Sequence, residues 1–256
     1  MFFYSISPNA ISASASLADT SIPDGIRTST RHSHLERSAH RAQPLRDRQP
    51  KGHALPARIG PLSATCDQTS ASYDALRGLA GPGGLLAVFL EAPPEPPPGW
   101  SLTRTGVLDQ MIFQGSGLPL PIRLEPKATL RRLTIADVPA MLELASLTEP
   151  GPFRQRTIEL GAFWGIFRED RLLAMTGQRL QLPHFAEVSA VCTHPEARGR
   201  GFARVLVATV LDAICRRSKT PFLHVLAEND DAIRVYAAAG FALRRKLHLA
   251  VLKNEA

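Results

Sequence analysis

The sequence predicts an α/β fold for the C-terminal half of the chain, and three observations support this. Residues 188–193 form an alternating apolar run that ends just before a proline, and an apolar period of the helical kind begins after Gly201. Residues 221–227 have the composition of a strand. Residues 230–239 fit a helix that stops at Gly240. Strands that alternate with helices in this way are typical of α/β proteins.

The remaining elements of this half follow from periodicity and turn residues. Further strands are expected at residues 129–134, 162–168, 172–180 and 241–252. A helix should begin near Asp137, because Pro139 then falls in the first turn, where a missing N–H costs little. The Pro-Gly-Pro sequence at 150–152 should end that helix.

The first half of the chain is less regular. Residues 1–60 are rich in Ser, Arg, His and Pro without any period, and we expect a disordered leader there. Residues 61–123 predict a small α/β extension, with a helix at 70–79 and strands at 85–90, 100–105 and 107–113. The sequence therefore divides into a leader at 1–60, an extension at 61–123 and a main domain at 124–256.

Composition argues against several classes of protein. The net charge is +7, and residues 1–60 carry eight Lys and Arg against four Asp and Glu, so more than half of the excess lies in the leader. We find no basic stripe interleaved with aromatic residues, so no nucleic-acid partner is expected. No apolar run has membrane-spanning length and no signal peptide is evident, so no membrane association is expected.

The three cysteines, Cys66, Cys192 and Cys215, are odd in number and lack metal-ligand spacing. This pattern predicts free thiols in a reducing cytoplasm and no metal site. Cys192 lies in an apolar strand, where a small core residue is the expected role rather than a nucleophile.

Residues 198–203, Arg-Gly-Arg-Gly-Phe-Ala, predict a cradle for phosphate. Gly199 and Gly201 lack a Cβ where the backbone must approach a ligand, and the following helix directs unpaired N–H groups toward an anion. Arg198 and Arg200 add positive charge. The segment has neither the Gly-Lys-Ser/Thr ending of a P-loop nor the spacing of a dinucleotide fingerprint, so nucleoside triphosphates and NAD are disfavoured.

Two ordered motifs resemble the GNAT superfamily of acetyl-CoA-dependent N-acetyltransferases. Arg198, Gly201 and Ala203 fit the superfamily's Arg/Gln-x-x-Gly-x-Gly/Ala pattern, and residues 229–241 fit its Asn-x-x-Ala-x-x-x-Tyr-x-x-x-Gly-Phe segment. The resemblance covers the chain from about Leu124 onward. It implies a mixed central sheet with helices on both faces, in the order β-α-α-β-β-β-α-β-α-β.

The resemblance also implies acetyl-CoA as co-substrate and a set of residues to hold it. The backbone N–H groups of Val191 and Thr193 would lie beside the acetyl group and the pantetheine arm. Asn229 would contact CoA, although an N-cap role also explains it. The phosphates would be held by the cradle residues Arg198, Gly199, Arg200, Gly201, Phe202 and Ala203.

Glu187 is the candidate general base. Strand periodicity places its carboxylate on the face opposite three apolar side chains, those of Val188, Ala190 and Cys192. GNAT enzymes often take their base from this strand, directly or through water. An ion pair with a neighbouring arginine such as Arg179 explains Glu187 equally well. His194 and His224 are alternative bases, although a loop role and a strand role account for them.

Tyr236 is the candidate general acid, because the tyrosine at this place in the motif usually protonates the departing sulfur in the superfamily. A core aromatic in a helix stripe is the competing interpretation. The predicted function is transfer of an acetyl group from acetyl-CoA to a primary amine by direct attack. A domain that binds CoA without turnover, as a sensor or scaffold, is the alternative.

The sequence leaves the amine open. A small molecule and a peptide remain candidates, as does another short acyl group in place of acetyl, and the oligomeric state is not predicted. By resemblance, residues 149–153 border the acceptor, and an ordinary turn explains that segment as well.

Overall fold

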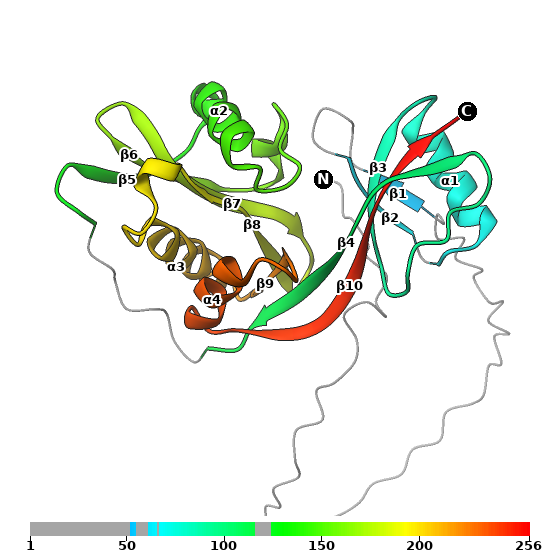
Figure 1. Ribbon diagram of the computed structural model, residues 1–256. Coiled ribbons are helices and arrows are strands. Elements are labelled where there is room, and N and C mark those ends of the chain that lie inside the picture. The colour runs from blue at the N-terminus through cyan, green and yellow to red at the C-terminus, as the bar shows by residue number, and fades with distance from the viewer. Residues whose placement is uncertain (1–51, 55–60, 66, 116–123) are drawn as a thin grey trace, which may run out of the picture. The chain divides into compact units, whose positions relative to one another are not determined.

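The chain forms an α/β fold around one large mixed sheet. The computed structural model describes residues 52–54, 61–65, 67–115 and 124–256, which belong to one compact unit. Its ten-stranded sheet has the order β1-β2-β3-β10-β4-β9-β8-β7-β6-β5 (Figure 1). The pairs β2–β3 and β8–β9 are parallel, and the neighbouring pairs β7–β8 and β4–β9 are antiparallel. The predicted mixed α/β sheet is therefore confirmed.

The bounds of the elements agree closely with expectation in the second half of the chain. The strands are β1 Gly52–Ala54, β2 Leu62–Thr65, β3 Leu85–Leu90, β4 Trp100–Phe113, β5 Ala128–Arg132, β6 Phe163–Arg168, β7 Arg171–Gln181, β8 Phe185–Thr193, β9 Thr220–Leu226 and β10 Phe241–Asn254. The helices are α1 Ser70–Ala80, α2 Val138–Thr148, α3 Phe202–Cys215 and α4 Asp230–Ala238, with short 3₁₀ helices η2 Ile135–Asp137, η3 Thr157–Leu160 and η4 Pro195–Ala197. Within the expected leader at 1–60, the structure describes residues 52–54, which form β1.

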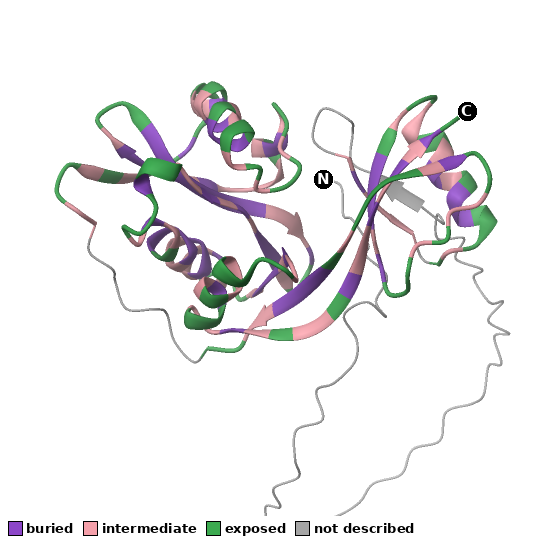
Figure 2. Ribbon diagram, viewed as in Figure 1, coloured by how far each residue is buried: buried purple, intermediate pink, exposed green. Residues whose placement is uncertain are grey.

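Helices cover both faces of the sheet, as Figure 1 shows. On one face, α2 places Met141 in a buried cluster with Ala190 and Cys192 of β8. On the other, α3 and α4 bury side chains against Val188 of β8. Buried residues therefore run along β7, β8 and the inner side of α3 (Figure 2). Within the described ranges, no helix is both long enough and apolar enough to cross a membrane.

A bulge in β8 corrects one expectation. The register pairs Cys192 with Met175 and Ser189 with Gly177, so Ala190 and Val191 together oppose one residue of β7. Ala190 has φ +52°, a conformation that inserts an extra residue into a strand. Simple alternation placed Val188, Ala190 and Cys192 on one face, which is wrong. Beyond the bulge the faces exchange, so Cys192 lies on the α2 face.

The extension and the main domain share the sheet. β10 pairs with β3 along one edge and with β4 along the other. The sequence predicted two strands at 100–105 and 107–113, but β4 is continuous through Gly106. β10 explains this, because it offers backbone partners along nearly the whole length of β4 and pairs its own Leu249 with Gly106.

The second helix implied by the resemblance is reduced to the 3₁₀ turn η3. Pro150 and Pro152 flank Gly151, which has φ +108°, so the chain cannot continue helically after α2. Asp137 is the N-cap residue of α2, as expected, but its carboxylate makes no capping bond to that helix. It instead accepts from the backbone N–H of Thr134 at 2.8 Å and pairs with Arg131.

Candidate active site

The parallel strands β8 and β9 pair only at one end. The register joins Phe185–Glu187 to Thr220–Phe222. Past Phe222, β9 continues to Leu226 with β4 as its partner, while β8 continues through its bulge to Thr193 with β7 as its partner. The facing edges of β8 and β9 beyond Glu187 thus leave backbone groups available for a ligand that lies between the strands.

Thr193 supplies an independent sign that a polar ligand fits at this place. Its hydroxyl Oγ1 is buried and has no hydrogen-bond partner among the described residues. Buried polar groups are nearly always paired in folded proteins, so an orphaned hydroxyl marks a place where a partner is absent. Thr193 ends β8 directly before the segment that leads into α3.

The predicted cradle lies at the N-terminus of α3. Gly199 and Gly201 have φ of +76° and +77°, the left-handed region that favours glycine. A Cβ built on either glycine would meet no atom within 4 Å, so open space lies beside this backbone. No side chain caps α3, and its first N–H groups therefore remain available to an anion. The local geometry fits a phosphate group.

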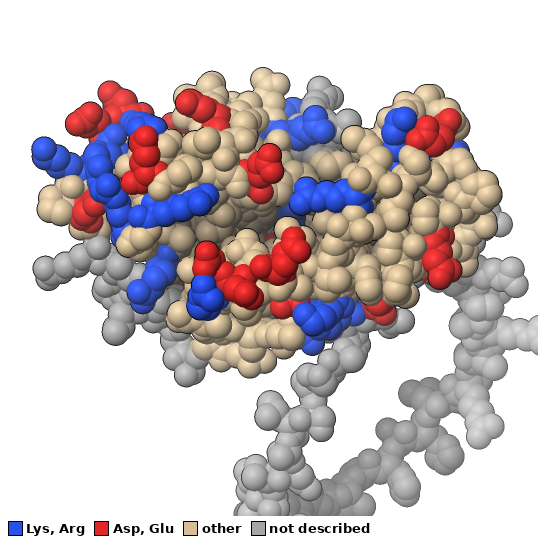
Figure 3. Space-filling view, in the orientation of Figure 1, with Lys and Arg blue, Asp and Glu red and all other residues tan. Residues whose placement is uncertain are grey.

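The other residues of the cradle differ in their exposure and in the side chains that they contact. Arg198 is exposed, and the aromatic ring of Phe202 is buried in the core, so the backbone of Phe202 is what remains for a ligand. Arg200 donates to Glu125 at 3.1 Å, and Arg168 pairs with the same carboxylate. On the face drawn in Figure 3, basic side chains lie among acidic ones.

Tyr236 and Asn229 lie on α4 and at its start. The Tyr236 ring is 8% exposed and meets Phe241 edge to face, with ring centroids 6.1 Å apart. Burial, with a smaller effect from Cys192, raises the pKa of the Tyr236 phenol, so it stays protonated at neutral pH. The Asn229 side chain accepts from the N–H of Ala232 at 3.1 Å, which confirms the N-cap role.

Cys192 and Cys215 are free thiols, as predicted, while Cys66 lies outside the described residues. Cys192 is 7% exposed, and burial raises the pKa of its thiol to about 11. A thiol with so high a pKa is a poor nucleophile, in agreement with a core role. Within the described ranges, no three His, Cys, Asp or Glu side chains gather as metal ligands would.

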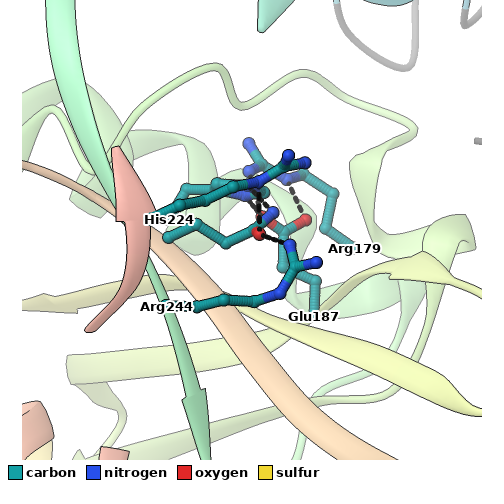
Figure 4. Close-up of polar contacts among 6 residues, drawn as sticks. Arg179, Glu187, His224 and Arg244 are labelled. Atoms are coloured by element: carbon teal, nitrogen blue, oxygen red, sulfur yellow. Dashed lines mark hydrogen bonds and ion pairs between the residues drawn. The ribbon is translucent and has the colours of Figure 1, made fainter. Parts of the chain in front are cut away.

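Glu187 is completely buried and lies at the centre of a polar network (Figure 4). Arg179 of β7 donates to both carboxylate oxygens, at 2.8 and 2.6 Å, and His224 Nδ1 lies 2.8 Å from Oε1. Burial alone would raise the pKa of Glu187, but the ion pair and the hydrogen bonds from Arg179 and His224 outweigh it and lower the pKa to about 2. The ion pair with Arg179 that the sequence offered as one interpretation is thus present.

Sequence reasoning missed several members of this network. Gln110 of β4 bonds to His224, Arg244 and Arg245. The Phe89 ring of β3 packs against His224 at a tilt of 52°, with ring centroids 4.8 Å apart. Gln110 and Phe89 belong to the extension at 61–123, which the sequence predicts to be separate from the main domain. In the sequence, the two adjacent arginines at 244 and 245 in the last strand were the one available sign of this network.

The Glu187–Arg179 pair makes a stability prediction. Glu187→Gln should lower the free energy of unfolding at pH 7 by about 3–5 kcal/mol, because it leaves Arg179 buried without its counter-charge. The folded pKa of Glu187 lies below its ordinary value of 4.5, so this contribution is complete above pH 4.5 and is lost as the pH falls toward 2. Urea unfolding at pH 7 and pH 3 measures both effects.

Glu159→Gln is the matched control, since its pair with Arg156 is exposed. It should cost no more than about 1 kcal/mol. If the two variants lose equal free energy of unfolding, the buried pair stabilises the protein no more than an exposed pair does, and the prediction is wrong.

Comparisons with known proteins agree with this geometry. The family of FR47-like proteins matches residues 163–249. A structure from Novosphingobium aromaticivorans, described as an acetyltransferase of the GNAT family, is 36% identical, covers 81% of this chain and 90% of its own, and has a TM-score of 0.71. A GCN5-related N-acetyltransferase from Kribbella flavida has a TM-score of 0.53 at 13% identity, covering 76% and 81% of the two chains. No curated protein matches the chain significantly.

The fold, the diverging strands and the similarity to solved acetyltransferases define the class of this protein, a transferase. The chain belongs to the GNAT superfamily of acetyltransferases.

Proposed function

We propose that the chain transfers an acetyl group from acetyl-CoA to a primary amine, carried by a small molecule or a peptide. The observation that carries this proposal is the cradle at Gly199 and Gly201, with open space beside it and an uncapped helix behind it. The Thr193 hydroxyl at the end of β8 is buried without a hydrogen-bond partner, and it supports a polar contact to the ligand there. We place the reaction in the cytoplasm, in keeping with the free thiols.

In this proposal the chain holds CoA mainly through its backbone. The N–H groups of residues 199–203 bind the pyrophosphate, with Arg198 and Arg200 nearby, and Asn229 contacts CoA from α4. The backbone of Val191 and Thr193 holds the acyl end, where N–H groups stabilise negative charge on the carbonyl oxygen. Bound acetyl-CoA supplies the acetyl group as a thioester.

The acceptor amine must lose a proton, because an alkylamine with a pKa near 10.4 is almost entirely protonated at neutral pH. Glu187 is a weak base by itself, since its pKa is about 2 and its oxygens already accept three hydrogen bonds. His224 does not take its place, because its Nδ1 contacts Glu187 and its Nε2 contacts the Gln110 amide. In this proposal the amine therefore passes its proton to a water molecule, through which Glu187 acts.

Tyr236 completes the proton balance. As the amine nitrogen bonds to the acetyl carbon and the carbon–sulfur bond breaks, the phenol donates its proton to the departing sulfur. The phenol is protonated at neutral pH and so carries the proton to be donated. The acceptor would approach beside residues 149–153, where Phe153 packs edge to face on Phe163 at 5.9 Å.

Thermal unfolding of the full chain with and without acetyl-CoA tests the first half of the proposal. Acetyl-CoA at about a hundred times its dissociation constant should add roughly 2.7 kcal/mol to the stability. Inorganic phosphate at the same concentration is the control for nonspecific anion binding. A folded protein whose melting temperature does not move would contradict acetyl-CoA binding.

Release of the CoA thiol in the presence of a panel of amines tests the second half. A rate that depends on both acetyl-CoA and one amine would support the transferase reaction. Stabilisation without thiol release by any amine would instead favour a domain that binds CoA without turnover.

A further inference from the structure

The hairpin end that joins β6 to β7 lies beside the cradle. Arg168 and Arg171 are cross-strand partners at this end. The backbone N–H of His194 donates to the carbonyl of Leu173 at 2.7 Å, and Arg171 donates to Glu196 at 2.9 Å. The segment that leads into the cradle is therefore held against this end of the sheet.

Two arginines share one carboxylate at this place. Arg200 of the cradle donates from Nη1 to Glu125 Oε2 at 3.1 Å, and Arg168 at the end of β6 pairs with Oε1 of the same carboxylate. Among the described residues, no other carboxylate pairs with either arginine. One carboxylate neutralises only one guanidinium, so the group carries an excess positive charge. The three side chains are between 28% and 39% exposed, and an anion from solution can therefore reach them.

The chemistry of this arginine pair suits a phosphate group. A guanidinium presents its N–H groups as a planar fork that matches two phosphate oxygens. The cradle binds the pyrophosphate through backbone, whereas the Arg200 side chain leads away from the cradle to Glu125. A phosphate that lies beyond the pyrophosphate would therefore meet Arg200 and Arg168 together.

The ligand proposed above carries such a phosphate. CoA has a phosphomonoester on the 3′ oxygen of its ribose, one sugar away from the pyrophosphate. A phosphomonoester carries a charge of about −1.5 to −2 at pH 7, so it gains strongly from a local excess of positive charge.

We propose that Arg168 and Arg200, held side by side by Glu125, bind the 3′-phosphate of CoA. The identity of the ligand rests on the function proposed above, but the phosphate site itself requires no acetyl transfer. The site would let the chain distinguish CoA from the same molecule without its 3′-phosphate. The backbone of the cradle cannot make this distinction, because the pyrophosphate is identical in both.

Isothermal titration calorimetry of the full chain with acetyl-CoA and with 3′-dephospho-acetyl-CoA tests the inference. Acetyl-CoA should bind at least about tenfold more tightly, because the 3′-phosphate adds charge-assisted hydrogen bonds. Equal affinities in the unmodified protein would overturn the inference.

Arg168→Gln should weaken the binding of acetyl-CoA by about tenfold and leave the affinity for the dephospho form unchanged. An equal loss for both ligands would mean that Arg168 acts only through the fold, which contradicts the proposal. Arg131→Gln is the matched control. Arg131 lies on the neighbouring strand β5 and also pairs with a carboxylate, that of Asp137 at 2.7 Å. This control should leave both affinities unchanged.

Glu125→Gln should have the opposite effect. The variant keeps an oxygen that accepts from an arginine but loses the negative charge beside the proposed phosphate. Acetyl-CoA should therefore bind at least about twofold more tightly, with no change for the dephospho form. Weaker binding of acetyl-CoA would indicate that the three residues only brace the cradle, and it would count against the proposal.

Adenosine 3′,5′-bisphosphate and adenosine 5′-monophosphate separate this inference from the proposed function, because neither contains an acyl group. Suppose that acetyl-CoA does not bind, but the bisphosphate binds at least about tenfold more tightly than the monophosphate and loses this advantage in Arg168→Gln. The proposed function then fails and the site for a ribose 3′-phosphate stands. If acetyl-CoA is a substrate but binds no better than its dephospho form, the phosphate site alone fails.

Discussion

Gly201→Glu is expected to lower the affinity for acetyl-CoA by at least about a hundredfold, equivalent to about 2.7 kcal/mol. The new side chain would extend into the open space beside the cradle and bring a carboxylate to the place proposed for the pyrophosphate. Like charges at this distance repel, and a helix N-terminus can serve only one anion at a time. Isothermal titration calorimetry measures the change.

The fold should survive this substitution at a modest cost. Gly201 has φ +77°, so a side chain there costs about 1–2 kcal/mol in backbone strain. Gly83→Glu is the matched control, because Gly83 also has a positive φ of +64° and open space around it but lies in the extension. It should lose similar stability and retain acetyl-CoA binding. Undiminished affinity in folded Gly201→Glu would refute the cradle.

Tyr236→Phe is expected to lower turnover by a factor of about 10²–10⁴ with little change in acetyl-CoA affinity. The substitution removes only the hydroxyl, so the ring keeps its edge-to-face contact with Phe241. Loss of the proton donor affects the departing sulfur, whose charge develops during the reaction and not on binding. Steady-state kinetics with acetyl-CoA and an active amine separate the two quantities.

Tyr73→Phe is the control for this prediction. Tyr73 is 1% exposed, lies in the core of the extension, and donates from its hydroxyl to Gln68 at 3.2 Å. It tests whether loss of any buried phenol slows the enzyme through stability. Equal turnover in Tyr236→Phe and the unmodified protein would remove Tyr236 from the mechanism and leave it as a core aromatic.

Local sequence predicted those features of the candidate site that depend on local structure. The glycine conformations and the helix start of the proposed cradle could be predicted, because they depend only on the backbone of Gly199 and Gly201 and on the helix that follows. Tyr236 and Asn229 could be named as candidates because they lie on α4 and at its N-cap, within a recognisable pattern. The C-terminal end of β8 at Thr193 was also correct, since the alternating run stops just before Pro195.

The parts that depend on strand pairing were not predictable in this way. The face exchange at Ala190 arises from one extra residue in β8, and no single residue type marks such a bulge. The contact between Gln110 and His224 joins residues 114 positions apart, and it exists because β4 enters the sheet beside β9. The sequence shows both residues but not their adjacency.

The pairing of β10 constrains how this protein could have evolved. Its C-terminal half lies between β3 and β4, and Ala250 and Leu252 are buried among side chains of the extension. If the extension were removed, β10 would present two unpaired edges and an uncovered apolar face, a known route to aggregation. The extension is therefore not a detachable module, and an ancestral gain of residues 61–115 would have required the last strand to lengthen with it.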